Sequence, residues 1–191
     1  MKGILLGRNI SWSNFCQWLR FLLKLIPNFE TMMRTLFISF MMTCGISSVY
    51  AQELNIVNYE ELENILAASP GKAKLVNFWA TWCKPCVEEL PYFNALQKEA
   101  DDKSPEFIFV SLDFMSQTPK VKDLIKRLSL NGTQLQLNQP GGEWIDQFDS
   151  NWSGAIPYTI LLLPGGEKIE HYDAFDSVEE LKSFLNKNIV N

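Results

Sequence analysis

Hydrophobic residues after position 52 follow two spacings, which predict alternating strands and helices. Dense apolar runs, typical of strands buried on both faces, occur at Lys74–Ala80, Glu106–Asp113 and Ile156–Leu163. Shorter runs predict further strands at Leu54–Val57, Thr133–Leu137 and Lys168–Tyr172. The turn residues Pro164-Gly165-Gly166 precede the last of these, so it is predicted to form a hairpin with the strand before the turn.

Between these runs the apolar residues recur at helical spacing. The predicted helices are Tyr59–Ala68, Cys86–Ala100, Lys120–Leu130, Gly142–Phe148 and a final one from Ser177 to about Ile189. Pro91 falls inside the second helix and is expected to kink it. Ser177 and Glu180 form the capping-box pattern that starts the last.

Strands that alternate with helices and end in a hairpin predict an α/β fold with a mixed β-sheet flanked by helices. The stretch VNFWATWCKPCVEELP, Val76–Pro91, holds two cysteines at the junction between a buried strand and the next helix. Ligands and chemistry collect at such junctions in α/β sheets. The function therefore depends on what Cys83 and Cys86 do.

Residues 1–51 are predicted to be targeting sequence, which leaves residues 52–191 as the folded domain. Arg34, an apolar run from Thr35 to about Ser47, and Val49-Tyr50-Ala51 form the three parts of a secretory signal peptide cleaved after Ala51. The preceding thirty residues have two interpretations: translation starts at Met32 or Met33, or Phe15–Ile26 is an interfacial helix or anchor. The pattern favours the first. Either way the domain is predicted to be periplasmic, membrane-anchored if the segment is retained.

The charge of residues 52–191 narrows the range of partners. This part has 12 basic and 21 acidic residues, a net charge of −9. Nucleic-acid binding requires a basic face. The balance therefore argues against nucleic acid and against docking on an anionic membrane surface.

Cleavage after Ala51 would remove Cys16 and Cys44 and leave a single CxxC pair. A structural zinc site needs four ligands, and only His171, in a distant predicted strand, adds to the two cysteines. We therefore predict no metal and no cofactor. A disulfide across a two-residue gap removes little entropy from the unfolded chain, so a stabilising role is also disfavoured.

A redox role has a direct physical basis. Cys83 would sit at a helix N-terminus, where free N–H groups and the helix dipole stabilise a thiolate. Pro85 suits the first helical turn because its missing N–H is not needed there. Cys86 would resolve the mixed disulfide, while Lys84 either adds positive charge or is simply solvated.

Two acidic residues follow the pair. Glu89 lies three residues after Cys86, on the same helical face, so its carboxyl group is a candidate for proton transfer with the Cys86 thiol. The alternative is that it only complements the helix dipole. For Glu88, which points elsewhere, we favour the alternative.

The stretch VNFWATWCKPCVEELP resembles the active-site segment of thioredoxin-like proteins, and more narrowly of the exported TlpA/ResA-type thiol-disulfide oxidoreductases. GAIPYT, Gly154–Thr159, resembles the cis-proline loop of that family. The resemblance implies a thioredoxin-like fold, a cis Ile156–Pro157 bond, and pairing of the Ile156 backbone with substrate. Trp79 and Trp82 match the family's aromatic residues, and Asn77 stands where cytosolic thioredoxins have a buried Asp, which shifts proton handling onto Glu89.

By the same resemblance, Cys83, Cys86 and Glu89 would be catalytic. Trp82, Lys84, Pro85, Ile156 and Pro157 would contact substrate. The expected partners are proteins with disulfides, among them apocytochrome c, and a membrane thiol donor that recharges the pair in a monomeric enzyme. Two alternatives stay open: a disulfide-forming oxidant and a non-catalytic peptide-binding module. Residues 131–153, with Trp144 and Trp152, have no residue-by-residue match, and the two tryptophans are as compatible with packing as with substrate contact.

Overall fold

The computed structural model describes residues 53–139 and 141–189. The predicted signal peptide, the cleavage after Ala51, the alternative anchor and the cysteines Cys16 and Cys44 lie outside these residues. No helix in the described ranges has the length and apolar character needed to cross a bilayer.

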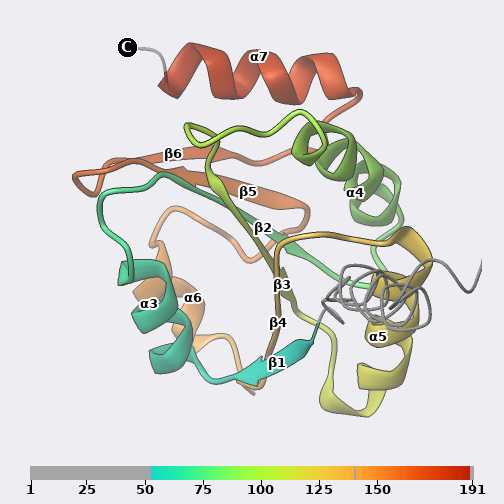
Figure 1. The fold of residues 1–191 in the computed structure, drawn as a ribbon. Helices are drawn as coiled ribbons and strands as arrows, with labels where there is room; N and C mark the ends of the chain where they lie inside the picture. The colour runs from blue at the N-terminus through green and yellow to red at the C-terminus, as the bar shows by residue number, and fades with distance from the viewer. Residues whose placement is uncertain (1–52, 140, 190–191) are drawn as a thin grey trace, which may run out of the picture. The chain divides into compact units, whose positions relative to one another are not determined.

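Six strands form one mixed sheet (Figure 1). They are β1 (Leu54–Val57), β2 (Lys74–Trp79), β3 (Glu106–Ser111), β4 (Thr133–Leu137), β5 (Tyr158–Leu162) and β6 (Lys168–His171). The order across the sheet is β1-β4-β3-β2-β5-β6. The first four strands in this order pair in parallel, whereas β5 pairs antiparallel with both β2 and β6. The sheet and the hairpin agree with the sequence-based prediction.

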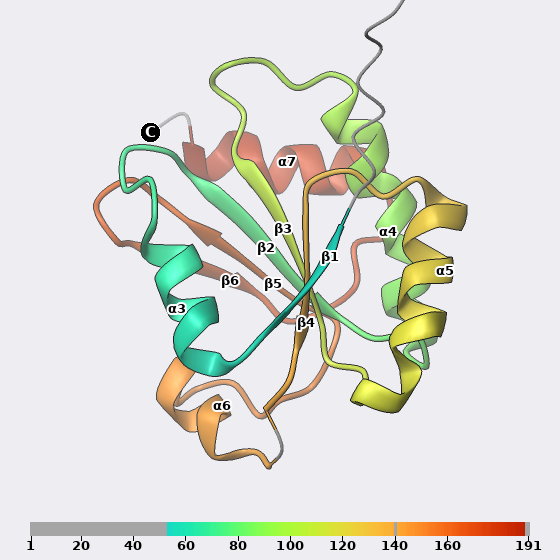
Figure 2. The same cartoon turned by 60° about the horizontal axis from the view of Figure 1, so that its bottom comes forward.

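Helices cover both faces of this sheet (Figure 2). They are α3 (Tyr59–Ala67), α4 (Lys84–Gln97), α5 (Thr118–Leu128), α6 (Glu143–Phe148) and α7 (Val178–Ile189), with a 3₁₀ turn η1 (Met115–Gln117) before α5. In both views α3 and α6 lie together, apart from α4, α5 and α7. The helices therefore make two layers, one on each face of the sheet.

Each layer has its own hydrophobic core. The α4, α5 and α7 side contains Cys86, Phe93 and Leu124, while the α3 and α6 side contains an aromatic cluster with Phe78, Trp144 and Trp152. Ile156 is half-buried and packs against both cores. Trp144 and Trp152 thus act in packing, the first of the two roles that the sequence allowed.

Some element boundaries differ from the sequence-based prediction for local reasons. α4 begins at Lys84, two residues earlier than predicted, because the Cys83 side chain already accepts a hydrogen bond from the backbone N–H of Cys86. α5 begins at Thr118 because Pro119 fits the first helical turn. β5 begins at Tyr158, after Pro157, which has no N–H to donate to the sheet. α4 continues through Pro91 to Gln97.

The cap of α7 also differs in detail. The Ser177 hydroxyl oxygen accepts from the backbone N–H of Glu180, at 3.2 Å, as predicted. The Glu180 carboxylate accepts instead from the backbone N–H of Asp176, at 2.7 Å, one residue before the expected partner. The helix start is therefore stabilised on both sides of Ser177.

Candidate active site

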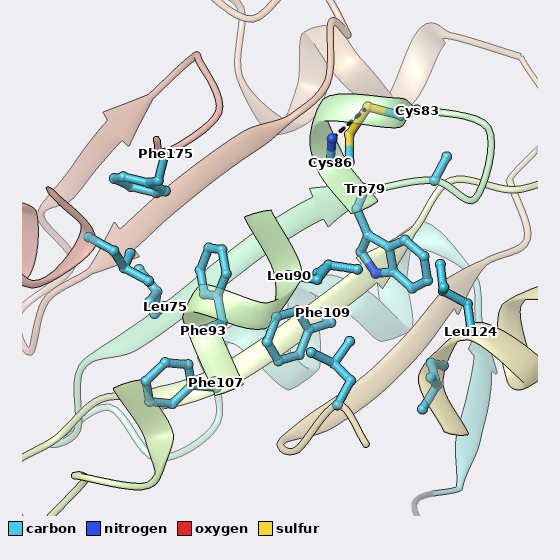
Figure 3. Close-up of a cluster of buried hydrophobic side chains, with 14 of the residues drawn as sticks. Leu75, Trp79, Cys83, Cys86, Leu90, Phe93, Phe107, Phe109, Leu124 and Phe175 are labelled. Atoms are coloured by element: carbon cyan, nitrogen blue, oxygen red, sulfur yellow. Dashed lines mark hydrogen bonds between the residues drawn. A yellow bond between two sulfur atoms is a disulfide. The ribbon is translucent and has the colours of Figure 1, made fainter. Parts of the chain in front are cut away.

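Cys83 and Cys86 are joined by a disulfide at the start of α4. The backbone N–H of Cys86 donates to the Cys83 sulfur at 3.3 Å, and Figure 3 shows this bond at the edge of the hydrophobic cluster. Cys83 keeps 6% of its surface exposed, and Cys86 keeps none. Of the two sulfurs, that of Cys83 is therefore the one that another molecule can reach.

The helix start supplies positive polarity to Cys83. The first N–H groups of α4 have no partner within the helix, and the helix dipole adds a partial positive charge there. Pro85 is exposed in the first turn, as predicted. Lys84 forms an exposed ion pair with Glu88, at 3.3 Å, and such surface pairs contribute little free energy. Glu88 is thus solvated, as expected.

The loop before β5 reaches the same sulfur. The Ile156–Pro157 bond is cis, as the family resemblance implied. The Ile156 carbonyl oxygen lies 3.7 Å from the Cys83 sulfur. When Cys83 is a thiol, its S–H can donate a hydrogen bond to this oxygen. Two segments more than seventy residues apart in the sequence thus meet at Cys83.

Residues of the unmatched segment 131–153 hold this loop in place. The indole N–H of Trp152 donates to the Ala155 carbonyl oxygen at 2.7 Å. Gly154 has φ +81°, and a Cβ there would lie 2.8 Å from the Ile145 side chain of α6. Only glycine fits this position without strain. The segment therefore serves to position the loop next to Cys83.

Glu89 is a buried residue of α4, one turn beyond Cys86. Its carboxylate accepts from the Asn77 side-chain amide at 2.8 Å and from the backbone N–H of Phe175 at 2.9 Å. Burial raises the pKa of Glu89 to about 7, against the opposing effect of these two hydrogen bonds. A carboxyl group with a pKa near 7 can both take up and release a proton at neutral pH.

Asn77 can accompany either protonation state of Glu89. Its amide nitrogen also donates to the Thr159 hydroxyl oxygen at 2.9 Å, whereas its buried carbonyl oxygen accepts no hydrogen bond from the described residues. Turning the amide by half a rotation would present that oxygen to a protonated Glu89. The interior can therefore satisfy Glu89 both with and without its proton.

The two tryptophans before the disulfide occupy different environments. Trp79 is buried, 1% exposed, in the core of the α4 side, and Trp82 is 65% exposed beside Cys83. His171 lies on the edge strand β6, with its ring stacked on Phe175 at 4.0 Å. No group of three or more His, Cys, Asp or Glu residues within the described ranges is arranged to hold a metal ion.

Asp113 is a site residue that the sequence analysis missed. It is 1% exposed, and its carboxylate accepts from the backbone N–H of Thr81 (2.8 Å), the Thr81 hydroxyl (2.5 Å) and the Ser111 hydroxyl (2.9 Å). Thr81 lies two residues before Cys83, so Asp113 positions the turn that leads into the disulfide. An acidic residue at the end of the predicted strand Glu106–Asp113 was the only available signal.

We expect Asp113→Asn to lower the free energy of unfolding by about 1–3 kcal/mol. An amide in this place offers one acceptor instead of two, so a buried donor of Thr81 or Ser111 loses its partner. Urea unfolding of the oxidised protein at pH 7 measures the loss. Asp123→Asn is the control, because Asp123 makes only an exposed ion pair with Arg127. Equal stabilities of the two variants would contradict the assigned role of Asp113.

The fold and the site together define a thioredoxin-like protein: a CxxC disulfide at a helix N-terminus, next to a cis-proline loop that leads into β5 of a mixed sheet. Residues 51–175 match the Redoxin family model, so the chain belongs to the Redoxin family. A solved thioredoxin-related protein from Neisseria meningitidis serogroup B has a similar fold, with a TM-score of 0.53 and 19% identity over 63% of this chain and 87% of that one.

Two curated relatives are proteins called thiol-disulfide oxidoreductase ResA. The chain is 30% identical to the one from Oceanobacillus iheyensis over 131 residues and 33% identical to the one from Bacillus thuringiensis subsp. konkukian over 119 residues. Each match covers 61% of this chain, but only 57% and 64% of the two relatives, less than two thirds of either. These findings confirm the resemblance to TlpA/ResA-type proteins.

Proposed function

We propose that the chain is a thiol-disulfide oxidoreductase of the cell envelope that reduces disulfides in exported proteins. The observation that carries the proposal is the difference between the two sulfurs. Cys83 is the accessible one, at a helix N-terminus and beside the Ile156 carbonyl, and Cys86 is fully buried behind it. A pair used only for stability would need no such asymmetry.

The reaction starts from the reduced pair. The Cys83 thiolate attacks one sulfur of the substrate disulfide, and the other substrate sulfur leaves as a thiolate that takes up a proton. Cys86 then loses its proton and attacks the Cys83 sulfur, which releases the second substrate thiol and restores the Cys83–Cys86 disulfide. Two electrons pass from the pair to the substrate.

Other residues assist these steps in the proposal. Glu89, with a pKa near 7, accepts the proton of Cys86. The substrate polypeptide contacts the residues next to Cys83 in the chain and the loop beside its sulfur, namely Trp82, Lys84, Pro85, Ile156 and Pro157. A membrane thiol donor returns two electrons to the pair after each turnover. An exported, periplasmic location accords with the targeting pattern of residues 1–51.

The reduction potential of the pair, combined with an insulin-reduction assay, tests the proposal. A reductase is expected to have a reduction potential of about −270 mV and to accelerate the reduction of insulin by dithiothreitol. A reduction potential of about −120 mV would instead indicate a disulfide-forming oxidant. If insulin reduction is not accelerated although the Cys83–Cys86 pair can be oxidised and reduced, the chain would be a peptide-binding module. That result would contradict the proposal.

A further inference from the structure

A groove of about 700 Å³ lies next to the disulfide, between the start of α4 and helix α5. Trp82, Val87, Phe114, Lys120, Leu124 and Arg127 line it, and we call it the α5 groove. Trp82 directly precedes Cys83, so the groove continues from the sulfur that a substrate must reach. It is separate from the Ile156–Pro157 loop, no residue of which lines it.

The groove is bordered by the two most exposed large hydrophobic side chains of the described residues. Phe114 is 81% exposed and Trp82 is 65% exposed. Below them, Leu124 is buried and Val87 is half-buried, so the groove has an apolar floor. Exposed aromatic residues around an apolar floor are typical of protein-binding sites.

The charge on this face is opposite to that of the rest of the domain. Helix α5 carries Lys120, Lys122, Lys126 and Arg127 but only one acidic residue, Asp123. One third of the basic residues after position 52 thus lie on one helix of a domain with a net charge of −9. The groove itself is lined by Lys120, Arg127 and Asp123, and the exposed Asp123–Arg127 ion pair is 3.7 Å long. Such a pair exchanges partners at little cost.

We propose that the α5 groove binds the substrate polypeptide next to its reactive cysteine, and that it selects segments with an apolar side chain and a carboxylate. The apolar side chain inserts between Trp82 and Phe114, and the carboxylate meets Lys120 and Arg127. This inference rests on the proposed reductase function and adds to it the chemistry of the preferred substrate.

Charge also argues against a second copy of this chain as the occupant. A two-fold dimer through the groove would bring the same patch from both molecules together. Since Lys120 and Arg127 outnumber Asp123 in the groove, each copy would present the same excess of positive charge to the other, which is unfavourable. An acidic polypeptide segment has no such conflict.

The test uses disulfide-containing synthetic peptides whose cysteines are flanked by Glu and Leu, by Lys and Leu, or by Glu and Ser. The readout is kcat/KM for each peptide divided by kcat/KM for hydroxyethyl disulfide. For the wild type we expect the Glu–Leu peptide to exceed the Lys–Leu peptide by about tenfold at low salt, and this preference to shrink at about 0.5 M salt.

Variants on the same helix assign the effect to the groove. Lys120→Gln with Arg127→Gln is expected to reduce the Glu-over-Lys preference to about twofold or less. The matched control is Lys122→Gln with Lys126→Gln, which removes the same charge from exposed α5 positions outside the groove. Phe114→Ser is expected to lower the value for the Glu–Leu peptide about fivefold and to leave the Glu–Ser peptide nearly unchanged.

Three results would overturn the inference alone. The first is a wild type without preference among the peptides that still reduces hydroxyethyl disulfide; the reductase function would then stand. The second is a control variant that loses the preference as fully as the groove variant. The third is a change of oligomeric state in Phe114→Ser, which would assign the groove to a second copy. A wild type that reduces no disulfide would overturn both the inference and the function on which it rests.

Discussion

Replacing Cys83 by Ser is expected to lower disulfide-reductase turnover by more than about a hundredfold, because a hydroxyl at its ordinary pKa is a far weaker nucleophile than a thiolate. Cys86→Ser is also expected to stop turnover, but at a later step. In that variant Cys83 still attacks the substrate, and the mixed disulfide persists because no buried thiol resolves it. The two cysteines thus differ in which species accumulates.

Mass spectrometry after a single turnover measures that difference. The Cys86→Ser protein, mixed with a disulfide-containing peptide, is expected to gain the mass of the peptide, and Cys83→Ser is expected to gain none. The reverse result would assign the attacking role to Cys86, against the exposures of 6% for Cys83 and none for Cys86. Circular dichroism of both variants verifies that they are folded.

Replacing Glu89 by Gln is expected to remove a large pH dependence of stability. Burial raises the pKa of Glu89 from 4.5 to about 7 in the folded protein. Between these values the folded state holds a proton that the unfolded chain has released, so the free energy of unfolding decreases as pH rises. The decrease amounts to about 3 kcal/mol, is absent below pH 4.5, and is complete above pH 7.

Urea unfolding of the oxidised protein at pH 4.5 and pH 8 measures this effect. The free energy of unfolding of Glu89→Gln minus that of the wild type is expected to be about 3 kcal/mol larger at pH 8 than at pH 4.5. The substituted amide can be accommodated because Asn77 has an unused carbonyl oxygen to accept from it. Glu88→Gln, an exposed neighbour, is the control. Identical pH profiles of Glu89→Gln and the wild type would show that Glu89 titrates normally.

Local patterns in the sequence predicted most of the elements and the centre of the site. The fully buried strand Lys74–Trp79 appeared as a continuous apolar run, and the bounds of Leu54–Val57 and Thr133–Leu137 were predicted correctly. Errors arose where side-chain or backbone chemistry decides a boundary. The Cys83 cap starts α4 early, and the missing N–H of Pro157 delays β5.

Contacts between distant segments could not be predicted in this way. The sequence pointed to Glu89 and Asn77, but not to the Phe175 N–H, 86 residues further on, that completes the carboxylate's partners. It also gave no sign that the Asp113 carboxylate accepts hydrogen bonds from Thr81, 32 residues earlier. Periodicity predicts which residues are buried, whereas these pairings depend on the order of strands across the sheet.

Ile156 links the two cores mechanically. Its side chain packs against both hydrophobic clusters, and its carbonyl oxygen lies 3.7 Å from the Cys83 sulfur. Packed interiors transmit strain because they contain few voids. A change of side-chain volume around Trp144 or Trp152 is therefore expected to shift Ile156, and with it the surface beside the Cys83 sulfur. The aromatic cluster on the other face of the sheet is thus expected to influence where the Ile156 carbonyl oxygen lies beside the Cys83 sulfur.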